Sequence, residues 1–414
     1  MAKTKEKAVL TRENWISNFN LIGEAVVKNP EYVYKIDERS EKSDWIYNSL
    51  NLGVDCGEKH GVVYAEMMGG YGAERANIIY AHGKKDDGTD DFQKKVEVAW
   101  EDRNNDDILE QVGDMCFITV GLEKTKQGKT FYKKFLSAYD AIKYVKEHLE
   151  NGMVVNVKGR LNYSTYQENV QVRKTITSIV LSGVDDKSKY AAHFTQSILL
   201  DKYSADLKNI DKDKGVMYVN AHVLEYVKEM NGLEIKGQYP YAKEFEYEFA
   251  DITNGDRCKK TYNNLFKVKK GITMITFDGD FIENGAVVSM TYDDLPDDIK
   301  ELVDCGVFTE EQAIEKCSSN GTKERRMVLR TPYVKKVGEE KTPVLQKFEE
   351  KYEEDDLIFD FPNQDDEYED YEGSSVDSIT EDDDLPFDVD DDNSNSKAES
   401  SNESDTSMSW LDEL

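Results

Sequence analysis

Two carboxylates stand two residues apart in the stretch FDGDF, which spans residues 277–281. Side chains alternate along a strand, so Asp278 and Asp280 would share one face and could hold a Mg²⁺ ion for phosphoryl chemistry. Asp293 or Asp294 would then have to supply a third ligand. The alternative is a pair of solvent-facing acids beside a β-hairpin. We favour this alternative, because no other motif indicates a nuclease or a polymerase accessory.

Histidine, cysteine and glycine spacings indicate no cofactor chemistry. The five His and five Cys residues lack the CxxC or HxxxH spacing of zinc sites. A Walker A loop needs four residues between its glycines, whereas six separate Gly121 from Gly128 in GLEKTKQGKTF. We therefore expect no metal, no cofactor and no catalytic residues. The scattered, odd-numbered cysteines are typical of free thiols in a reducing cytoplasm.

Basic and aromatic residues interleave along several predicted strands, and this is the clearest functional signal. Proteins hold single-stranded nucleic acid with Lys and Arg along its backbone and with aromatic rings that stack on its bases. The alternative is that Tyr residues fill strands while Lys residues keep those strands soluble. The residues expected to contact single-stranded DNA are Trp45, Lys124, Lys126, Lys129, Phe131, Tyr132, Lys133, Lys134, Lys158, Arg160, Tyr163, Tyr166, Arg173, Tyr239, Tyr241, Lys259, Lys260 and Tyr262.

Strand alternation also predicts how some of these residues point. Lys158 and Arg160 are two residues apart, so they share one face of their strand. Arg173 and Lys174 are adjacent, so they point to opposite faces and cannot both line one groove without a bulge.

The elements that must position these residues are mostly strands. A helix is expected from Ser137, with Asp140 completing a capping box and Gly152 ending it. Strands, then one helix, then a β-hairpin is the closing order of an OB-fold, a five-stranded Greek-key barrel. The predicted strands of this first block are 20–27, 61–68, 76–83, 94–101, a hairpin over 115–135 with a basic loop at 124–128, 153–167 and 170–183.

A second block of strands has a similar size and composition, and we interpret it as a second OB-like barrel. Its predicted strands are 194–202, 215–227, 244–250, 271–281, 286–292 and 325–334, with a turn at 283–285 and helices at 294–304 and 309–317. The predicted fold is therefore dominated by β-structure with minor α-structure. Its expected parts are a flexible basic N-terminus (1–13), two OB-like domains (14–185 and 186–337) and a disordered acidic tail (338–414).

Charge is distributed unevenly along the 414 residues, whose formal net charge is -31. Residues 349–414 contain 27 acidic residues and only Lys351 and Lys397, a net charge of -25, which leaves -6 for residues 1–348. The overall acidity therefore says little about what the folded part binds. We expect a cytoplasmic location and no membrane partner, since the N-terminus has no signal-peptide core and no apolar run approaches ~18 residues.

Four segments carry a resemblance to a known family: NFNLIGEAVV (18–27), SDWIYNSLNLGVDCGE (43–58), FYKKFLSAYDAIKYVKEHLENGMVVNVKGRLNYSTY (131–166) and VQVRKTITSIVLS (170–182). They resemble the single-stranded DNA-binding protein of phages that infect low-GC Gram-positive bacteria. The resemblance extends over residues 15–335. It implies OB-folds, binding of single-stranded DNA without strong sequence preference, and a role in phage DNA replication, recombination or repair.

The tail contains the stretch DDDLPF at 382–387. Apart from Leu in place of Ile, it resembles the acidic end of bacterial single-stranded DNA-binding proteins, Asp-Asp-Asp-Ile-Pro-Phe. In that family the Phe is the last residue and its carboxylate helps to dock partners, whereas 27 residues follow Phe387 here. We expect the tail to recruit replication and recombination proteins, to compete with DNA, or both. The expected partner-binding residues are Asp382, Asp383, Asp384, Leu385, Pro386, Phe387, Trp410 and Leu411.

The sequence thus predicts a non-enzymatic protein that coats and protects single-stranded DNA. Two other hypotheses stay open. One is an acidic DNA mimic or scaffold that binds basic proteins and ignores oligo-dT. The other is the Mg²⁺-dependent nuclease or polymerase accessory, which would lose turnover of DNA when Asp278 or Asp280 is replaced.

Overall fold

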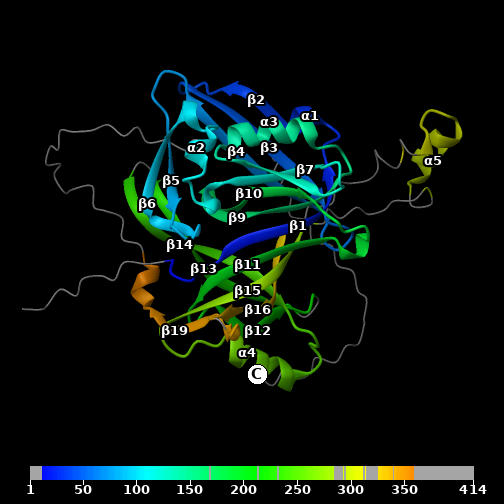
Figure 1. The fold of residues 1–414 in the computed structure, drawn as a ribbon. Helices are drawn as coiled ribbons and strands as arrows, with labels where there is room; N and C mark the ends of the chain where they lie inside the picture. Colours follow the sequence, from blue (N-terminus) through cyan, green and yellow to red (C-terminus); the bar gives the residue numbers. More distant parts are fainter. Residues whose placement is uncertain are drawn as a thin grey trace, which may run out of the picture.

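The computed structural model describes residues 12–166, 169–211, 214–230, 233–283, 292, 295–310, 313, 325–338 and 340–358. Figure 1 shows two lobes of β-structure, one built from the first half of the chain and one from the second. A 15-stranded sheet runs through both lobes. The predicted β-dominated, OB-fold-like architecture is confirmed.

Five strands close the first barrel. They follow one another around the ring as β1 (Ser17–Val26), β3 (Trp45–Asp55), β4 (Val62–Gly72), β10 (Asn169–Leu181) and β9 (Val154–Tyr166), which returns to β1. The β4–β10 pairing is parallel and the other four are antiparallel. Helix α3 (Ala138–His148) lies between β4 and β9, as predicted for an OB-fold.

Helix α3 packs directly on the barrel because β4 has a glycine beneath it. A Cβ added at Gly69 would lie 2.8 Å from Ala138 Cβ. The Ser137 hydroxyl caps the helix by accepting from the Tyr139 amide, as expected. Two details differ from the prediction. Asp140 pairs with Arg103 instead of closing a capping box, and the helix reaches its C-cap at Leu149, three residues before Gly152.

Several elements are inserted into this barrel. Helix α1 (Pro30–Val33) and β2 (Tyr34–Arg39) connect β1 to β3. A longer insertion connects β4 to α3 and has its own small core of Val98, Val112, Phe117 and Leu136. It consists of β5 (Ile78–Lys84), β6 (Asp90–Ala99), η1 (Trp100–Asp102), α2 (Asp106–Leu109), η2 (Asp114–Cys116) and the predicted hairpin of β7 (Ile118–Lys124) and β8 (Thr130–Phe135).

The second barrel closes in the same order. Its ring is β11 (Ala191–Leu200), β13 (Val216–Met230), β14 (Leu233–Glu248), β16 (Arg326–Pro332) and β15 (Ile272–Ile282), with β14–β16 parallel. Helix α4 (Gly255–Leu265) occupies the position of α3, between the third and fourth strands. The sequence did not predict this helix. The helix expected at 294–304 is present as α5 (Asp297–Asp304), and the strand expected at 286–292 lies outside the described residues except for Tyr292.

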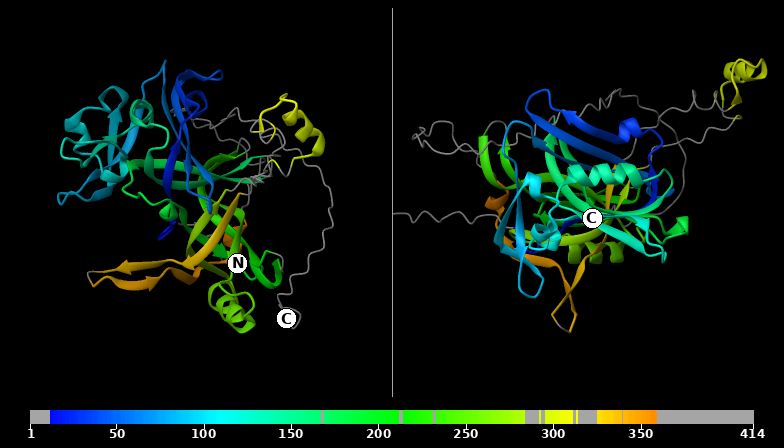
Figure 2. Two further views of the ribbon diagram at one scale, coloured as in Figure 1. Left: turned by 90° about the vertical axis from the view of Figure 1, so that its right-hand side faces the viewer. Right: turned by 45° about the horizontal axis from the view of Figure 1, so that its top comes forward.

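Strands β1 and β11 join the two barrels, from Ser17 opposite Gln196 to Ile22 opposite Ala191. The expected tail begins later than residue 338. Strands β17 (Val334–Val337) and β18 (Thr342–Leu345) form a hairpin that projects from the second barrel (Figure 2), and β19 (Lys347–Tyr352) pairs with β15 and buries Tyr352. The remaining described elements are η3 (Lys187–Lys189), β12 (Ala205–Asp211) and η5 (Glu354–Leu357).

All eight expected partner-binding residues of the tail lie outside the described residues. Within the described part of the chain, no helix combines the length and the apolar character needed to cross a bilayer.

Candidate nucleic-acid interface

A row of cross-strand partners crosses seven strands and both barrels on a single face of the sheet. Direct partners in neighbouring strands point their side chains to the same side. Lys158 on β9 is central: Ser178 lies opposite it on β10 and Asn20 on β1. From β8 to β15 the row reads Lys134, Thr119, Ser178, Lys158, Asn20, His193 and Asp280.

A second row runs beside the first, centred on Arg160. Thr175 lies opposite Arg160 on β10, and Asn18 lies opposite it on β1. From β3 to β15 the row reads Asn51, Glu66, Thr175, Arg160, Asn18, Thr195 and Asp278. Each residue in the two rows is polar, and we call the rows together the polar ladder. The barrels curl, so the ladder is a curved band on the outside of the sheet.

The exposed cations are concentrated at the centre of the polar ladder. Lys158 and Arg160 are exposed, whereas Gly159 between them and Leu161 after them are buried, so the predicted shared face is confirmed. Arg173 lies opposite Asn162, on the ladder side. Its neighbour Lys174 points inward, where its ammonium lies 2.6 Å from Glu283 Oε1. Arg173 and Lys174 therefore do point to opposite faces, as predicted.

Aromatic side chains border the ladder on β3 and β4. Trp45 and Tyr47 stack with ring centroids 4.9 Å apart. Glycines make room for rings on this face, since a Cβ at Gly70 would lie 2.8 Å from Trp45 Nε1 and a Cβ at Gly53 would lie 3.2 Å from Tyr64 Cε1. Alternation puts Trp45 and Tyr47 on the same side as Asn51. It likewise puts Tyr64 on the side of Glu66, and we call Trp45, Tyr47 and Tyr64 the aromatic face.

Tyr47 and Tyr64 were not predicted as site residues. The signal was present in the stretch WIYNSLNL at 45–52. Its even-numbered positions Asn48, Leu50 and Leu52 are buried, so its odd-numbered positions form the outer face.

The hairpin of β7 and β8 presents its expected residues on two different sides. Lys124, Lys126 and Lys129 surround its exposed turn. Tyr132 and Lys134 point to the ladder side, and Lys134 pairs with Asp114 at 3.0 Å. Phe131 and Lys133 alternate to the other side, where the Lys133 ammonium lies 4.8 Å from the Tyr144 ring centroid of α3. These residues cannot all contact one strand of DNA along one groove.

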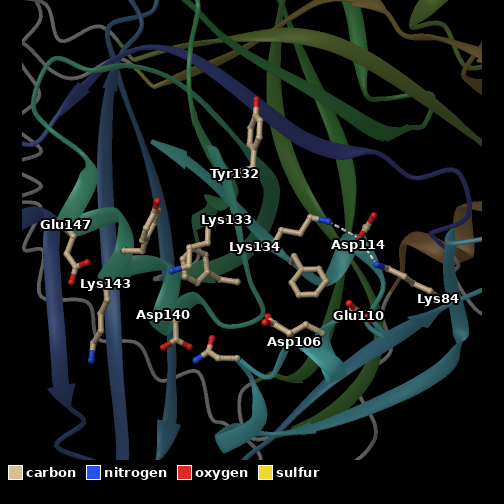
Figure 3. A pocket seen from close by; sticks show the side chains of 15 residues that line it. Lys84, Asp106, Glu110, Asp114, Tyr132, Lys133, Lys134, Asp140, Lys143 and Glu147 are labelled. Carbon is tan, nitrogen blue, oxygen red and sulfur yellow. Dashed lines mark hydrogen bonds and ion pairs between the residues drawn. The ribbon is translucent and has the colours of Figure 1, made fainter. Parts of the chain in front are cut away.

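A cleft of about 940 Å³ between β8, α2, η2 and α3 has the wrong charge for a phosphate groove. Figure 3 shows Asp114 between Lys84 and Lys134, both of which it pairs with at 3.0 Å. The acids that line the cleft are Asp106, Glu110, Asp114, Asp140 and Glu147, against Lys84, Lys133, Lys134 and Lys143. Because the acids outnumber the bases, we exclude this cleft from the interface.

For two of the residues expected to contact single-stranded DNA, the prediction is wrong because the structure buries their rings. Tyr163 is 3% exposed and donates its hydroxyl to Gln196 Oε1 at 3.0 Å. Tyr241 is 4% exposed, and burial raises its pKa to about 12. Neither ring can stack on a base without opening the core. Tyr166, in contrast, is 54% exposed at the end of β9.

The other expected residues of the second barrel lie away from the ladder. Tyr239 packs against the core and against the Tyr241 ring, 4.7 Å away. Lys259, Lys260 and Tyr262 belong to α4 and not to a strand, and the Tyr262 hydroxyl donates to the Ala205 carbonyl oxygen at 3.1 Å. Helix α4 lies at the opposite end of the second barrel from β9 and β10 (Figures 1 and 2).

Asp278 and Asp280 do share a face, but not as a metal site. Asp280 is buried among three basic side chains: Lys59 Nζ at 2.7 Å, His193 Nδ1 at 2.7 Å and Arg330 Nε at 2.9 Å. Asp278 accepts from the Thr195 hydroxyl at 2.6 Å. These neighbours occupy the carboxylate oxygens that Mg²⁺ would need. Among the described residues, no three His, Cys, Asp or Glu side chains are arranged to hold a metal ion.

Comparison with known proteins gives similarity to single-stranded DNA-binding proteins only at low identity. The YorF family model matches residues 76–268. No curated protein matches. A deletion mutant of the single-stranded DNA binding protein from Thermus aquaticus is 11% identical with a TM-score of 0.29, covering 65% of this chain and 88% of that chain. The wild-type protein is 10% identical with a TM-score of 0.28, covering 65% and 86%. At these TM-scores the likeness does not indicate what the chain binds.

Proposed function

We propose that this protein binds single-stranded DNA along the polar ladder and the aromatic face. One observation carries the proposal: Lys158 and Arg160 stand exposed at the centre of two polar rows that continue from one OB barrel into the other. OB barrels bind oligonucleotides on the face of their second and third strands, which here are β3 and β4 with the aromatic face. The centre of the polar ladder and the aromatic face both lie on the outside of the first barrel.

The proposed division of work follows from residue type. Lys158, Arg160 and Arg173 neutralise successive phosphates. Trp45, Tyr47 and Tyr64 stack on bases, and stacking is tolerant of sequence because every base has a π-face. Asn18 and Asn20 offer amide groups that can donate to phosphate or base oxygens. The protein would therefore coat single strands without strong sequence preference, as a phage replication or recombination function requires.

The acidic tail has a proposed role in the same reaction. Residues 359–414, beyond the last described element, contain 21 acidic residues and a single Lys. A tether of this charge competes with phosphates for Lys158 and Arg160 at high effective concentration. It also offers acid-flanked apolar residues, such as Leu385 and Phe387, to partner proteins.

The decisive experiment is a titration of intrinsic tryptophan fluorescence with oligo-dT at two salt concentrations. The full chain and a variant that ends at residue 358 are compared, which leaves β19 paired with β15. We expect binding that weakens strongly with salt, because cation–phosphate contacts release counterions. Truncation should tighten binding, most clearly at low salt.

Each alternative outcome has a meaning of its own. No binding of oligo-dT at low salt by either form overturns the proposal and favours the acidic mimic or scaffold. Binding that truncation does not change leaves the tail only its partner-recruiting role. Duplex DNA of equal length serves as the control, because it cannot stack its bases on the aromatic face.

A further inference from the structure

The insertion in the first barrel brings a cysteine, a histidine and an aspartate into a line. Cys116 Sγ in η2 lies 3.2 Å from His82 Nδ1 on β5. The other ring nitrogen, His82 Nε2, lies 2.7 Å from Asp90 Oδ1 on β6. The three residues are spread over 35 positions of the chain, so only the fold assembles them. None of the three belongs to the polar ladder or to the aromatic face.

The local backbone is adapted to this arrangement. The register of β5 and β6 shifts between His82 and Gly83, and such a bulge re-aims a side chain. A Cβ at Gly113 would lie 2.3 Å from Asp90 Oδ1 and 2.4 Å from His82 Cδ2, so only glycine lets the backbone pass this close. The Met115 amide donates to the same Asp90 oxygen at 3.1 Å.

The hydrogen bonds fix which nitrogen of His82 carries the proton. The Met115 amide, and then the His82 side chain, lower the pKa of Asp90, so Asp90 is an ionised acceptor. An ionised carboxylate can only accept, which puts the proton of the neutral ring on Nε2. His82 Nδ1 is then left with a lone pair that faces Cys116 Sγ. His82 is therefore placed as a general base beside the Cys116 thiol, and Asp90 orients the His82 ring.

We propose that Cys116 is a nucleophilic thiol and a site of reversible oxidation by hydroperoxides. The thiolate is the reactive form of cysteine, and a histidine that accepts its proton generates it. Cys116 is partly exposed, so a small oxidant can reach it. Thiols with these two properties are the ones that oxidise selectively.

The reaction with hydrogen peroxide balances within this group. Cys116 Sγ transfers its proton to His82 Nδ1, and the thiolate attacks one peroxide oxygen. The S–O bond forms as the O–O bond breaks, and the departing hydroxide takes the proton back from His82 to leave as water. The sulfur is oxidised from thiol to sulfenic acid and the peroxide is reduced to water. Asp90 stabilises the transient imidazolium and keeps its ionised form throughout.

Acyl-transfer chemistry at the same thiol has no support. Such chemistry needs amide groups that are free to stabilise an oxyanion. The amides next to Sγ are already engaged: Met115 N to Asp90, Cys116 N to the Gly113 carbonyl at 3.0 Å, and Phe117 N to the Asp114 carbonyl at 3.3 Å. We therefore assign modification and not hydrolysis.

The test uses the full-length reduced protein and measures each cysteine by peptide mass spectrometry. Iodoacetamide reports nucleophilicity, and hydrogen peroxide followed by dimedone reports sulfenic acid. Cys305 is exposed and serves as the reference inside the same molecule, while Cys56 and Cys258 are buried. We expect Cys116 to be alkylated about tenfold faster than Cys305 at neutral pH, and to be the first residue to form a dimedone adduct.

Two variants test the arrangement. His82→Gln removes the base, and Asp90→Ala removes the carboxylate that orients the ring and keeps its proton on Nε2. Both should bring the Cys116:Cys305 ratio down to about 1. Asp87→Asn, in the neighbouring turn where Asp87 accepts from Thr89, is the matched control and should keep the wild-type ratio.

Alkylation of the wild-type chain unfolded in urea gives a second test, which does not depend on whether a variant folds. In the unfolded wild-type chain the Cys116:Cys305 ratio should also fall to about 1, because no histidine is then held beside the thiol. A native ratio of 1 or less overturns the proposal. A raised native ratio that survives in urea, or that survives in folded His82→Gln, overturns it as well.

Discussion

The Lys59 ammonium lies 2.7 Å from Asp280 Oδ2 and connects the β3–β4 turn of the first barrel to β15 of the second. Two further contacts join the same segments. His60 Nδ1 donates to the Phe281 carbonyl oxygen at 2.8 Å, and the Glu283 amide donates to the His60 carbonyl oxygen at 2.9 Å. Together with the β1–β11 pairing, these contacts hold the barrels at two places. The continuity of the polar ladder depends on these contacts, because the ladder crosses from one barrel to the other.

Replacing Asp280 by asparagine should destabilise the protein by about 3 kcal/mol, because Lys59 and Arg330 lose the buried counter-charge that they share. Urea unfolding at pH 7 measures the loss. Asp278→Asn is the matched control: its carboxylate accepts one hydroxyl, from Thr195, and the expected cost is about 1 kcal/mol or less. Equal midpoints for the two variants would show that Asp280 does not clamp the barrels.

The same variant should change the dependence of stability on pH. Burial raises the pKa of Asp280, but hydrogen bonds from His193, Lys59 and Arg330 outweigh it and hold the pKa below its ordinary value of 3.8. A lowered carboxyl pKa stabilises the folded state above pH 3.8, and this contribution is lost as the pH falls from there toward the native pKa. The difference between wild type and Asp280→Asn should therefore shrink below about pH 4. A difference that stays constant from pH 3 to 7 would contradict the assignment.

Most of the first barrel could be predicted from sequence because its signals are local, although β3 was not among the predicted strands. Strand alternation, a well-capped amphipathic helix and the closing hairpin follow one another along the chain. Helix α4 was not predicted because its sequence GDRCKKTYNNL is mostly polar and Cys258 is the one residue of the helix that is buried. Its few apolar residues form too narrow a stripe for the hydrophobic period to reveal a helix.

Part of the site could have been predicted better, and part could not. The alternation that puts Leu161 inside also puts Tyr163 inside, two residues later on β9. The rows of the polar ladder are different, because they depend on register between strands that are far apart in sequence. Nothing local to Lys158 indicates that it lies opposite Asn20, or that Asn20 lies opposite His193.

Replacing Lys158 or Arg160 by alanine should weaken oligo-dT binding and reduce its salt dependence. The slope of log K against log salt is negative, and each lost phosphate contact should make it shallower by about 0.7, the value for single strands. Lys259→Ala and Lys260→Ala on α4 remove the same charge from the far end of the second barrel and should leave the slope unchanged. Titrations over a range of salt concentrations give the slope. An equal effect of all four variants would mean that total charge, and not the ladder, determines binding.

Removing a ring from the aromatic face should cost about 1–3 kcal/mol of binding free energy per stacked base. Trp45→Ala and Tyr64→Ala should show this loss with little change in the salt slope, since neither residue is charged. Tyr203→Ala is the control, because Tyr203 is 77% exposed but lies outside both the ladder and the aromatic face. Fluorescence anisotropy of labelled oligo-dT is the appropriate measurement, because it does not rely on Trp45 as the reporter. A loss in Tyr203→Ala as large as in Tyr64→Ala would argue against a localised stacking site.

Gly69→Ala tests whether α3 must touch β4 to complete the first barrel. The new Cβ would meet Ala138 Cβ at 2.8 Å and the Tyr139 amide nitrogen at 3.0 Å, and neither atom can rotate away. The helix would have to move, although the buried Asn48 side chain holds it by donating to the Tyr139 carbonyl oxygen at 2.7 Å. We expect a loss of about 1–3 kcal/mol in urea unfolding, the usual cost of overpacking. Gly183→Ala has no atom within 4 Å of its new Cβ, so it should be neutral or stabilise by about 0.4–1 kcal/mol through the unfolded chain. If both substitutions shifted the midpoint equally, the close contact between α3 and β4 would not be needed for stability.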